Sequence, residues 1–175
     1  MLYFAYGSNM SVLRLHARVS SANPLDTAML TGHSLQFHKV GKDASGKCDA
    51  HETGVFSDKV IGIIYELDDR DKSLLDGIEG LGCGYDEKEV TIVASDGQQL
   101  KAMVYVATHI DPSLKPYHWY KEHVLRGAKE HNLPPDYIQA IDAIQSVPDP
   151  DGDRHNHEIS IYLQGKTIDE CYLET

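Results

Sequence analysis

The hydrophobic residues of this chain fall into short runs and spaced stripes that predict strands and helices in mixed order. The first run, Leu2–Ala5, is apolar and aromatic and predicts a strand. It stops at the turn sequence YGSN at residues 6–9, after which Met10 and Leu13 recur at helical spacing. We therefore expect a strand, a tight turn and a helix whose first N–H groups are capped by Ser8 or Asn9.

The other strand signals surround one strongly apolar segment. Val60–Leu67, with the sequence VIGIIYEL, is apolar on both faces at its centre and predicts a central strand buried on both sides. Weaker patterns predict strands at His33–Val40, Tyr85–Ala94 and Leu100–Ala107, the last two joined by an Asp-Gly hairpin. The segment Gly41–Glu52 is rich in Gly, Ser, Asp and Lys, so we expect an exposed loop that can serve as a lid.

A helix is predicted over Asp68–Glu79, beside a cluster of glycines. Leu74, Leu75 and Ile78 fall on one helical stripe, and the aspartates at its start suit the positive end of a helix dipole. Glycines crowd in at positions 77, 80, 82 and 84. They should end the helix and turn the backbone sharply before the next strand.

The last third of the chain is mostly helical in pattern. One helix is predicted from Tyr117 onwards, and Pro134-Pro135 starts another. Beyond Val147 the sequence is polar and turn-rich, and Ile159–Leu163 suits either a last strand or a last helix. Elements in this order predict an α+β fold, with a small curved mixed β-sheet or partial β-barrel flanked by helices. We expect one domain over residues 1–175, whose C-terminal tail begins at about residue 148.

The charge of the chain excludes several classes of partner. Its 16 Lys and Arg residues face 27 Asp and Glu residues, which gives a net charge of −11. Because nucleic-acid affinity comes largely from cations that neutralise phosphates, neither nucleic acid nor an anionic membrane is an expected partner. No apolar run approaches the roughly 18 residues that span a bilayer, and no export signal is recognisable, so we expect a cytoplasmic protein.

The three cysteines carry no pairing signal. Cys48, Cys83 and Cys171 are odd in number and widely spaced, and no C-x-x-C pair suggests a zinc or dithiol site. A reduced chain without a metal is therefore the expected form. Cys83 would be a nucleophile only if a histidine lay beside it in the fold, so a thiol hydrolase is a minor alternative and an inert thiol is favoured.

Glu79 is the first candidate for catalysis. It follows Leu75 by four residues and so lies beside the inward stripe of its helix, just before the glycines. Partial burial and the negative end of the helix dipole both disfavour a carboxylate anion there, which would suit a general base working near neutral pH. The competing interpretation is a solvated glutamate at a helix end, and position alone does not exclude it.

Two other groups can belong to a small-molecule site. The backbone N–H groups of residues 6–9 lead into a helix and can bind an anion or stabilise an oxyanion, although a plain strand-to-helix turn is equally consistent. Tyr120, in an aromatic cluster with Tyr117 and Trp119, can orient a polar ligand with its hydroxyl group. Core packing is the commoner reason for such a cluster.

Four sequence blocks are more specific in combination than any of them is alone. They are YFAYGSNM at Tyr3–Met10, VIGIIYEL, LLDGIEG ending in Glu79 and Gly80, and YKEHVLRGAKEHNLP at Tyr120–Pro134. Their order and spacing over roughly Leu2–Ile144 resemble the γ-glutamylcyclotransferase family, whereas the tail does not clearly match. Relatives often carry a second acidic residue shortly before the catalytic one, where this chain has Gly77-Ile78.

The resemblance implies a fold, a reaction and a site. It implies a small β-barrel or strongly curved sheet flanked by helices, with a cavity lined by the YGSN turn. Family members convert a γ-glutamyl amino acid or amine into 5-oxoproline and the free amino compound, without a cofactor or a metal. Matched by position, the catalytic glutamate falls on Glu79, and the substrate-binding residues fall on Tyr6, Gly7, Ser8, Asn9, Met10 and Tyr120.

The substrate and the oligomeric state stay open at this point. The departing group can be an amino acid, a lysine side-chain amine or a biosynthetic intermediate, because the expected lid and tail would set the pocket walls. A non-catalytic module that binds a small metabolite on the same scaffold is the alternative function, and a partly buried Glu79 favours the enzyme. A weak homodimer is compatible with the sequence.

Overall fold

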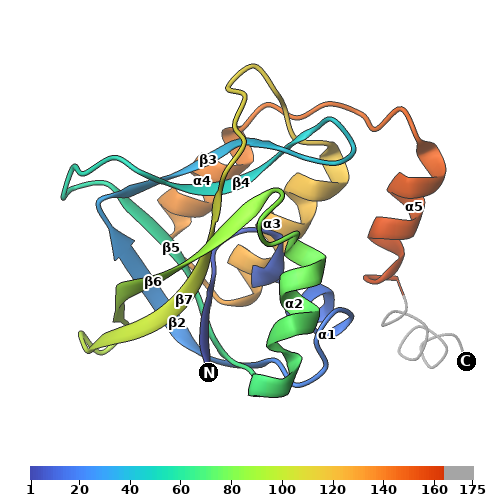
Figure 1. Cartoon of the computed structure of the whole chain (residues 1–175). Helices are drawn as coiled ribbons and strands as arrows, with labels where there is room; N and C mark the ends of the chain where they lie inside the picture. Colours follow the sequence, from blue (N-terminus) through green and yellow to red (C-terminus); the bar gives the residue numbers. More distant parts are fainter. Residues whose placement is uncertain (164–175) are drawn as a thin grey trace, which may run out of the picture.

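Five strands close into a barrel at the centre of the computed structural model, which describes residues 1–163 (Figure 1). The strands are β1 (Leu2–Ala5), β2 (Asn23–Thr31), β5 (Lys59–Glu66), β6 (Tyr85–Ala94) and β7 (Gln99–Ala107), in the order β1-β5-β2-β6-β7. Neighbouring strands are antiparallel except β1 and β7, which run parallel where Tyr3 pairs with Met103. The predicted curved mixed sheet is confirmed, and it closes fully.

β5 is the strand that the sequence marks most clearly. It lies between β1 and β2, and Val60, Ile63, Ile64 and Tyr65 are each at most 1% exposed. A segment that is apolar on both faces is stable where both faces are covered, so the predicted central strand is confirmed. The predicted hairpin of β6 and β7 is also present, with Gly97 at a φ of 87° in its turn.

A second sheet pairs β3 (His33–Val40) with β4 (Gly46–Glu52). The exposed loop predicted over Gly41–Glu52 is therefore wrong for most of its length. The polar composition of this segment was misleading because part of it is buried with its polar groups satisfied. Asp49, for example, is 4% exposed, and its carboxylate accepts a hydrogen bond of 2.8 Å from the N–H of Ala107.

β2 has no counterpart among the predicted strands. Its first half contains Pro24 and Asp26, two residue types that are depleted in strands, and its register against β5 shifts between them. Asp26 is accommodated because its carboxylate accepts hydrogen bonds from Ser95 and from the N–H of Thr27. These contacts are specific to the folded barrel, so the local pattern did not reveal the strand.

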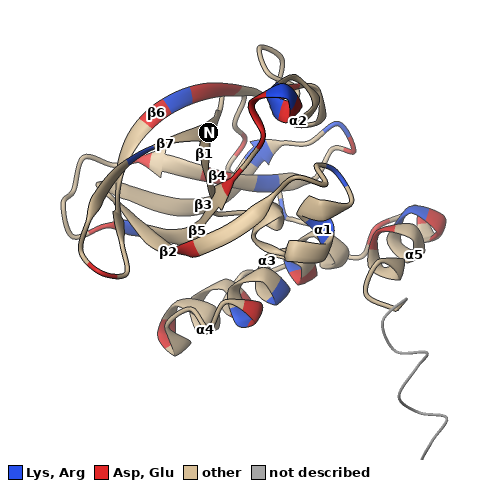
Figure 2. Ribbon diagram, turned by 90° about the horizontal axis from the view of Figure 1, so that it is seen from below, with Lys and Arg blue, Asp and Glu red and all other residues tan. Residues whose placement is uncertain are grey.

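Helices cover the barrel on two sides (Figure 2). Within residues 1–163 they are η1 (Ser8–Met10), α1 (Val12–His16), η2 (Asp69–Asp71), α2 (Lys72–Glu79), α3 (His118–Glu130), α4 (Pro135–Ala143) and α5 (Gly152–Ser160), where η marks a 3₁₀ turn. In Figure 2, α1, α3 and α4 lie on one side of the barrel and α2 on the other. The helices predicted after Tyr117 and at Pro134-Pro135 are confirmed. No helix in the described part of the chain is long and apolar enough to cross a bilayer.

α2 packs differently from its predicted stripe. Of the three aliphatic residues expected to face inward, Leu75 is buried, whereas Leu74 is 51% and Ile78 36% exposed. The helix is eight residues long and follows a 3₁₀ turn, so one buried side chain anchors it. It ends as predicted at Gly80, which adopts the left-handed conformation with a φ of 74°.

α5 lies in the segment predicted to be turn-rich, and that prediction is wrong. The Asp151 side chain caps the helix by accepting a hydrogen bond of 3.0 Å from the N–H of Arg154. Glu158 of α5 forms an ion pair with Arg14 of α1. Ile159–Leu163 is the end of this helix and a following turn, and not a strand. Polar contacts hold α5, so the hydrophobic pattern could not reveal it.

Candidate active site

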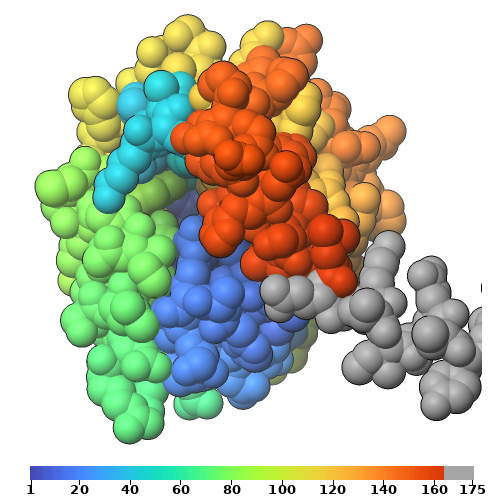
Figure 3. All heavy atoms as spheres, turned by 90° about the vertical axis from the view of Figure 1, so that its right-hand side faces the viewer, coloured from blue at the N-terminus to red at the C-terminus, as the bar shows by residue number. Residues whose placement is uncertain are grey.

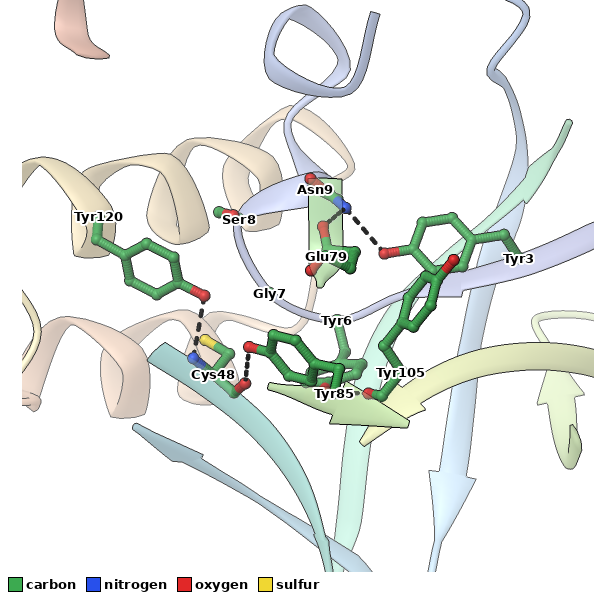
Figure 4. A pocket seen from close by; sticks show the side chains of 10 residues that line it. All are labelled: Tyr3, Tyr6, Gly7, Ser8, Asn9, Cys48, Glu79, Tyr85, Tyr105 and Tyr120. Carbon is green, nitrogen blue, oxygen red and sulfur yellow. Dashed lines mark hydrogen bonds between the residues drawn. The ribbon is translucent and has the colours of Figure 1, made fainter. Parts of the chain in front are cut away.

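A small cavity lies beside the turn that follows β1 (Figure 4). It holds about 30 Å³ and takes its walls from both sheets, α2 and α3. One carboxylate, one thiol and five tyrosines face it. The lining residues are Tyr3, Tyr6, Gly7, Ser8, Asn9, Cys48, Glu79, Tyr85, Tyr105 and Tyr120.

Gly7 brings the turn against β4. A Cβ atom at this position would lie 2.9 Å from the Cβ atom of Cys48, so a larger residue would push the two segments apart. Neither Ser8 nor Asn9 caps the helix with its side chain, so that prediction is wrong. Among residues 1–163, the backbone N–H groups of Gly7, Ser8 and Asn9 have no hydrogen-bond partner. They are therefore free to bind an anionic group in the cavity.

Glu79 is the last residue of α2, and its side chain is 14% exposed. Its Oε1 atom accepts a hydrogen bond of 2.9 Å from Nδ2 of Asn9 and one of 3.2 Å from Nη1 of Arg18. Both donors point at the same carboxylate oxygen and fix its position. Within residues 1–163 no donor is hydrogen-bonded to Oε2, so this oxygen is available to a ligand.

Asn9 is held in one orientation by three partners. Its Nδ2 atom donates to the hydroxyl group of Tyr3 at 3.0 Å as well as to Glu79. Its Oδ1 atom accepts a hydrogen bond of 2.9 Å from Arg18. Arg18 thus contacts both Asn9 and Glu79. A carboxylate fixed in this way can meet a substrate without first losing rotational freedom.

Neutral hydroxyl groups make up much of the remaining wall. Burial raises the pKa of all five tyrosines, so each phenol stays protonated: Tyr3, Tyr6, Tyr85, Tyr105 and Tyr120. Tyr6 donates to the backbone oxygen of Tyr105 at 2.6 Å, and Tyr85 to that of Cys48 at 2.7 Å. Tyr120 instead accepts a hydrogen bond of 3.0 Å from the N–H of Cys48. Its own O–H hydrogen is therefore not committed to the backbone.

Other reactive groups near Glu79 are less suited to catalysis. Partial burial opposes the ionisation of Asp76, but hydrogen bonds from Lys72 and Tyr105 outweigh it and lower the pKa of Asp76. Burial raises the pKa of Cys48 to about 12, so this thiol is neutral. Cys83 is exposed and does not line the cavity, which removes the basis for a thiol hydrolase. Cys171 lies outside the described residues.

A larger cavity of about 300 Å³ adjoins the first and shares Ser8, Glu79, Tyr85 and Tyr120 with it. It corresponds to the hollow beside α5 in Figure 3. Its further lining residues are Arg14, Arg18, Lys39, Gly41, Lys42, Asp43, Lys47, Ile78, Trp119, Arg154 and Glu158. The inner cavity has room for a water-sized group, whereas the outer one matches the size of small-molecule sites, so a ligand would extend across both.

The cavities do not contain an evident metal-ligating set. In the described part of the chain, one group of side chains can hold an ion: His38, Asp49 and His51 of the two-stranded sheet, whose ligand atoms lie within 4.8 Å of one another. Nε2 of His38 and Oδ2 of Asp49 are already 2.8 Å apart, at hydrogen-bond distance. None of these three residues lines either cavity.

Similar proteins are known for most of the chain. Residues 59–141 match the model of the AIG2-like family. The chain is 32% identical over 148 residues to the γ-glutamylcyclotransferase of Bos taurus and 31% identical to that of Homo sapiens, which covers 82% of this chain and 78% of each relative. The chain belongs to the γ-glutamylcyclotransferase family. A solved structure of a γ-glutamyl cyclotransferase matches with a TM-score of 0.79 at 27% identity, over 89% of this chain and 98% of that one. The resemblance and the fold predicted from the sequence are confirmed.

Most of the site residues implied by the γ-glutamylcyclotransferase resemblance come together in the structure. Those that line the inner cavity are Glu79, Tyr6, Gly7, Ser8, Asn9 and Tyr120. Met10 does not line it. Met10 is fully buried, its backbone oxygen accepts a hydrogen bond from the hydroxyl group of Tyr65, and its side chain packs where a Cβ atom on Gly127 would reach. Met10 therefore packs in the core beneath the turn and does not face the cavity.

Other residues of the site were missed by sequence reasoning. They are Tyr3, Cys48, Tyr85, Tyr105 and Arg18. The first four enter from β1, β4, β6 and β7, and alternation along a strand does not separate a residue that faces a cavity from one that faces the core. Arg18 follows α1 and belongs to no periodic stripe, so no sequence signal pointed to it.

Proposed function

We propose that this chain cyclises a γ-glutamyl amino acid or amine to 5-oxoproline and releases the free amino compound. The observation that carries the proposal is the arrangement of Glu79, a carboxylate on the cavity wall with one oxygen held by two donors and the other without a donor among residues 1–163. The curated relatives carry the name of this activity.

Glu79 acts first as a base and then as an acid. The α-ammonium group of the substrate cannot attack until it loses a proton, which Oε2 of Glu79 accepts. The α-nitrogen then forms a bond to the γ-carbonyl carbon, and the bond between that carbon and the departing nitrogen breaks as the proton is delivered there. In total the α-nitrogen loses two protons and the departing nitrogen gains two, so Glu79 ends the cycle ionised.

Positioning supplies much of the rate, because both reacting groups belong to one molecule. The free N–H groups of Gly7, Ser8 and Asn9 hold either the α-carboxylate of the substrate or the oxygen of the tetrahedral intermediate. Tyr6 and Tyr120 border the same space with neutral hydroxyl groups. Proton transfer and positioning complete the reaction, so we propose neither a cofactor nor a metal.

We also propose a cellular location and a domain organisation for the chain. We place the enzyme in the cytoplasm, because its cysteines carry no disulfide pattern. We treat residues 1–175 as one domain, since the elements from β1 to α5 pack on one hydrophobic core. The weak homodimer stays a prediction.

Release of 5-oxoproline from a panel of γ-glutamyl compounds tests the proposal, with a chelator present. The kcat of the Glu79→Gln variant should fall by about 10²- to 10⁴-fold, which is the factor that general acid–base catalysis usually contributes to a rate. Glutamine keeps the side-chain oxygen that faces Asn9 and Arg18, so folding and ligand binding should persist. The matched control is Cys83→Ala, which changes an exposed thiol outside the cavity and should turn over at the wild-type rate.

Three results would contradict this assignment. A Glu79→Gln variant with the wild-type rate would show that Glu79 is not the base. Loss of activity on adding the chelator would show that a metal takes part. Tight binding of one γ-glutamyl compound by the wild-type protein without any 5-oxoproline would favour the binding module.

A further inference from the structure

One cationic side chain on the wall of the outer cavity is largely covered and has no carboxylate partner within residues 1–163. Four of the cavity's six cations form ion pairs: Arg14 with Glu158, Arg18 with Glu79, Lys47 with Asp43 and Arg154 with Asp149. Lys42 is exposed to solvent. Lys39 is 7% exposed, and within residues 1–163 its ammonium group makes no hydrogen bond or ion pair.

A bulge in β3 places Lys39 at this wall. The register between β3 and β4 shifts between Gln36 and Lys39, and such a shift redirects side chains. The Nζ atom of Lys39 lies 4.6 Å from the centre of the Tyr85 ring. Gly84 leaves room for it, because a Cβ atom there would lie 2.9 Å from Nζ. The ammonium group thus faces the same cavity as Glu79.

The charged side chains on the wall of the outer cavity favour a bound anion. Burial lowers the pKa of Lys39, and the charge of Glu79 works against that shift without forming an ion pair with Lys39. Within residues 1–163 no carboxylate pairs with this ammonium group, so an anionic group bound in the cavity could form a charge-assisted hydrogen bond with it. The outer cavity has six cations against three carboxylates, in a chain whose net charge is −11. The excess of positive charge is therefore local to the cavity.

We propose that Lys39 binds a carboxylate on the departing part of the substrate and so selects γ-glutamyl amino acids over γ-glutamyl amines. This inference rests on the proposed function. The α-carboxylate of the substrate is adjacent to the α-ammonium group that must reach Glu79, and the free N–H groups of residues 7–9 are beside that point in the inner cavity. The departing group then extends into the outer cavity, where Lys39 lies.

The test compares two substrates that differ by a single carboxylate. We would measure kcat/KM for γ-glutamylalanine and for γ-glutamylethylamine with the wild-type protein, Lys39→Met and Lys39→Arg. Lys39→Met should lower kcat/KM for γ-glutamylalanine by about 10- to 100-fold, the range of a hydrogen bond to a charged group, and leave γ-glutamylethylamine within about threefold. Lys39→Arg should retain most of the preference.

Two further variants separate the proposal from a general effect of charge or packing. Lys129→Met makes the same charge change at an exposed position of α3 outside both cavities, and it should alter neither substrate. Gly84→Ala keeps Lys39 but displaces its ammonium group, so it should reduce the preference in the same direction as Lys39→Met.

Each outcome bears on one of the two proposals. An equal loss of kcat/KM for both substrates in Lys39→Met would show that Lys39 holds the γ-glutamyl part. No loss of kcat/KM for either substrate would show that Lys39 binds no substrate group. Either result would overturn the inference. If the wild-type protein converts neither compound nor any other γ-glutamyl compound of the panel, the proposed function fails. The same pair is then compared by calorimetry: tighter binding of γ-glutamylalanine that is lost in Lys39→Met would support the role of Lys39, and equal or absent binding would overturn it.

Discussion

The histidine buried beneath α5 should make the protein lose stability as the pH falls from about 7 to about 4.5. His123 of α3 is fully buried. Nη1 of Arg14 lies 2.7 Å from its Nε2 atom, and the hydroxyl group of Tyr162 lies 2.6 Å from its Nδ1 atom. Because a guanidinium group can only donate, Nε2 accepts from Arg14 in the neutral ring, whose proton is then on Nδ1, and Oε2 of Glu158 lies 3.2 Å from the same Nε2 atom. A second proton on Nε2 would therefore face the guanidinium group of Arg14, at 2.7 Å, more closely than the carboxylate of Glu158.

The magnitude follows from the shift in pKa. Burial, assisted by the charge of Arg14, lowers the pKa of His123 to about 4, although Glu158 opposes the shift. An unfolded histidine titrates near pH 6.5, so between about pH 6.5 and 4 the unfolded chain binds a proton that the native protein does not. This contribution to stability is complete above about pH 6.5 and is lost as the pH falls. At about 1.36 kcal/mol per pKa unit, the loss by pH 4.5 is about 2.5 kcal/mol.

The assay is urea unfolding of the wild-type protein and of His123→Gln across this range of pH. Glutamine offers a donor and an acceptor to Tyr162 and Arg14 but does not titrate, so the free energy of unfolding of the variant should fall by about 2.5 kcal/mol less. The other histidines titrate in both proteins and cancel in the difference. The stability contributed by Glu158 also cancels in part. Because the pKa of Glu158 is about 2, most of that contribution is lost at a pH below the range of the assay. Parallel curves for the two proteins would refute the reasoning.

Two substitutions in the cavity wall give further tests, both read by release of 5-oxoproline. Gly7→Ala should lower kcat/KM at least about tenfold and the free energy of unfolding by about 1–3 kcal/mol, because its Cβ atom would lie 2.9 Å from that of Cys48; an unchanged rate would show that the turn tolerates displacement. Tyr120→Phe should raise KM about 3- to 10-fold with kcat nearly unchanged, the value of one hydrogen bond. An unchanged KM would return Tyr120 to a role in core packing.

The sequence predicted the elements whose stability is local or generic. β5 and β6 were found because β-branched and apolar residues cluster in them, and the end of α2 was found because Gly80 can adopt positive φ. β2, β4 and α5 were missed or misassigned because distant partners stabilise their polar residues. Asp26 depends on Ser95, Asp49 on Ala107 and Glu158 on Arg14.

The residues of the candidate site also fall into those with a local sequence signal and those without one. The YGSN turn and Glu79 carry signals within a few residues, and the structure brings them together, although the catalytic role of Glu79 stays a prediction. Arg18 and Tyr105 enter the site from other elements, and only the folded barrel shows that they border it or contact Glu79. Lys39 is buried because β3 is bulged, and no composition rule predicts where a strand will bulge.

The closure of the barrel has a consequence for folding. β1 joins β5 and β7 through pairs such as Tyr3 with Tyr65 and Tyr3 with Met103, which are far apart along the chain. Contacts of such sequence separation form late, after local hairpins such as β6 and β7. The turn that begins at Tyr6 gains its opposite wall only when β1 is in place. The active site is therefore complete only when the barrel is closed, and local hairpins and helices alone do not assemble it.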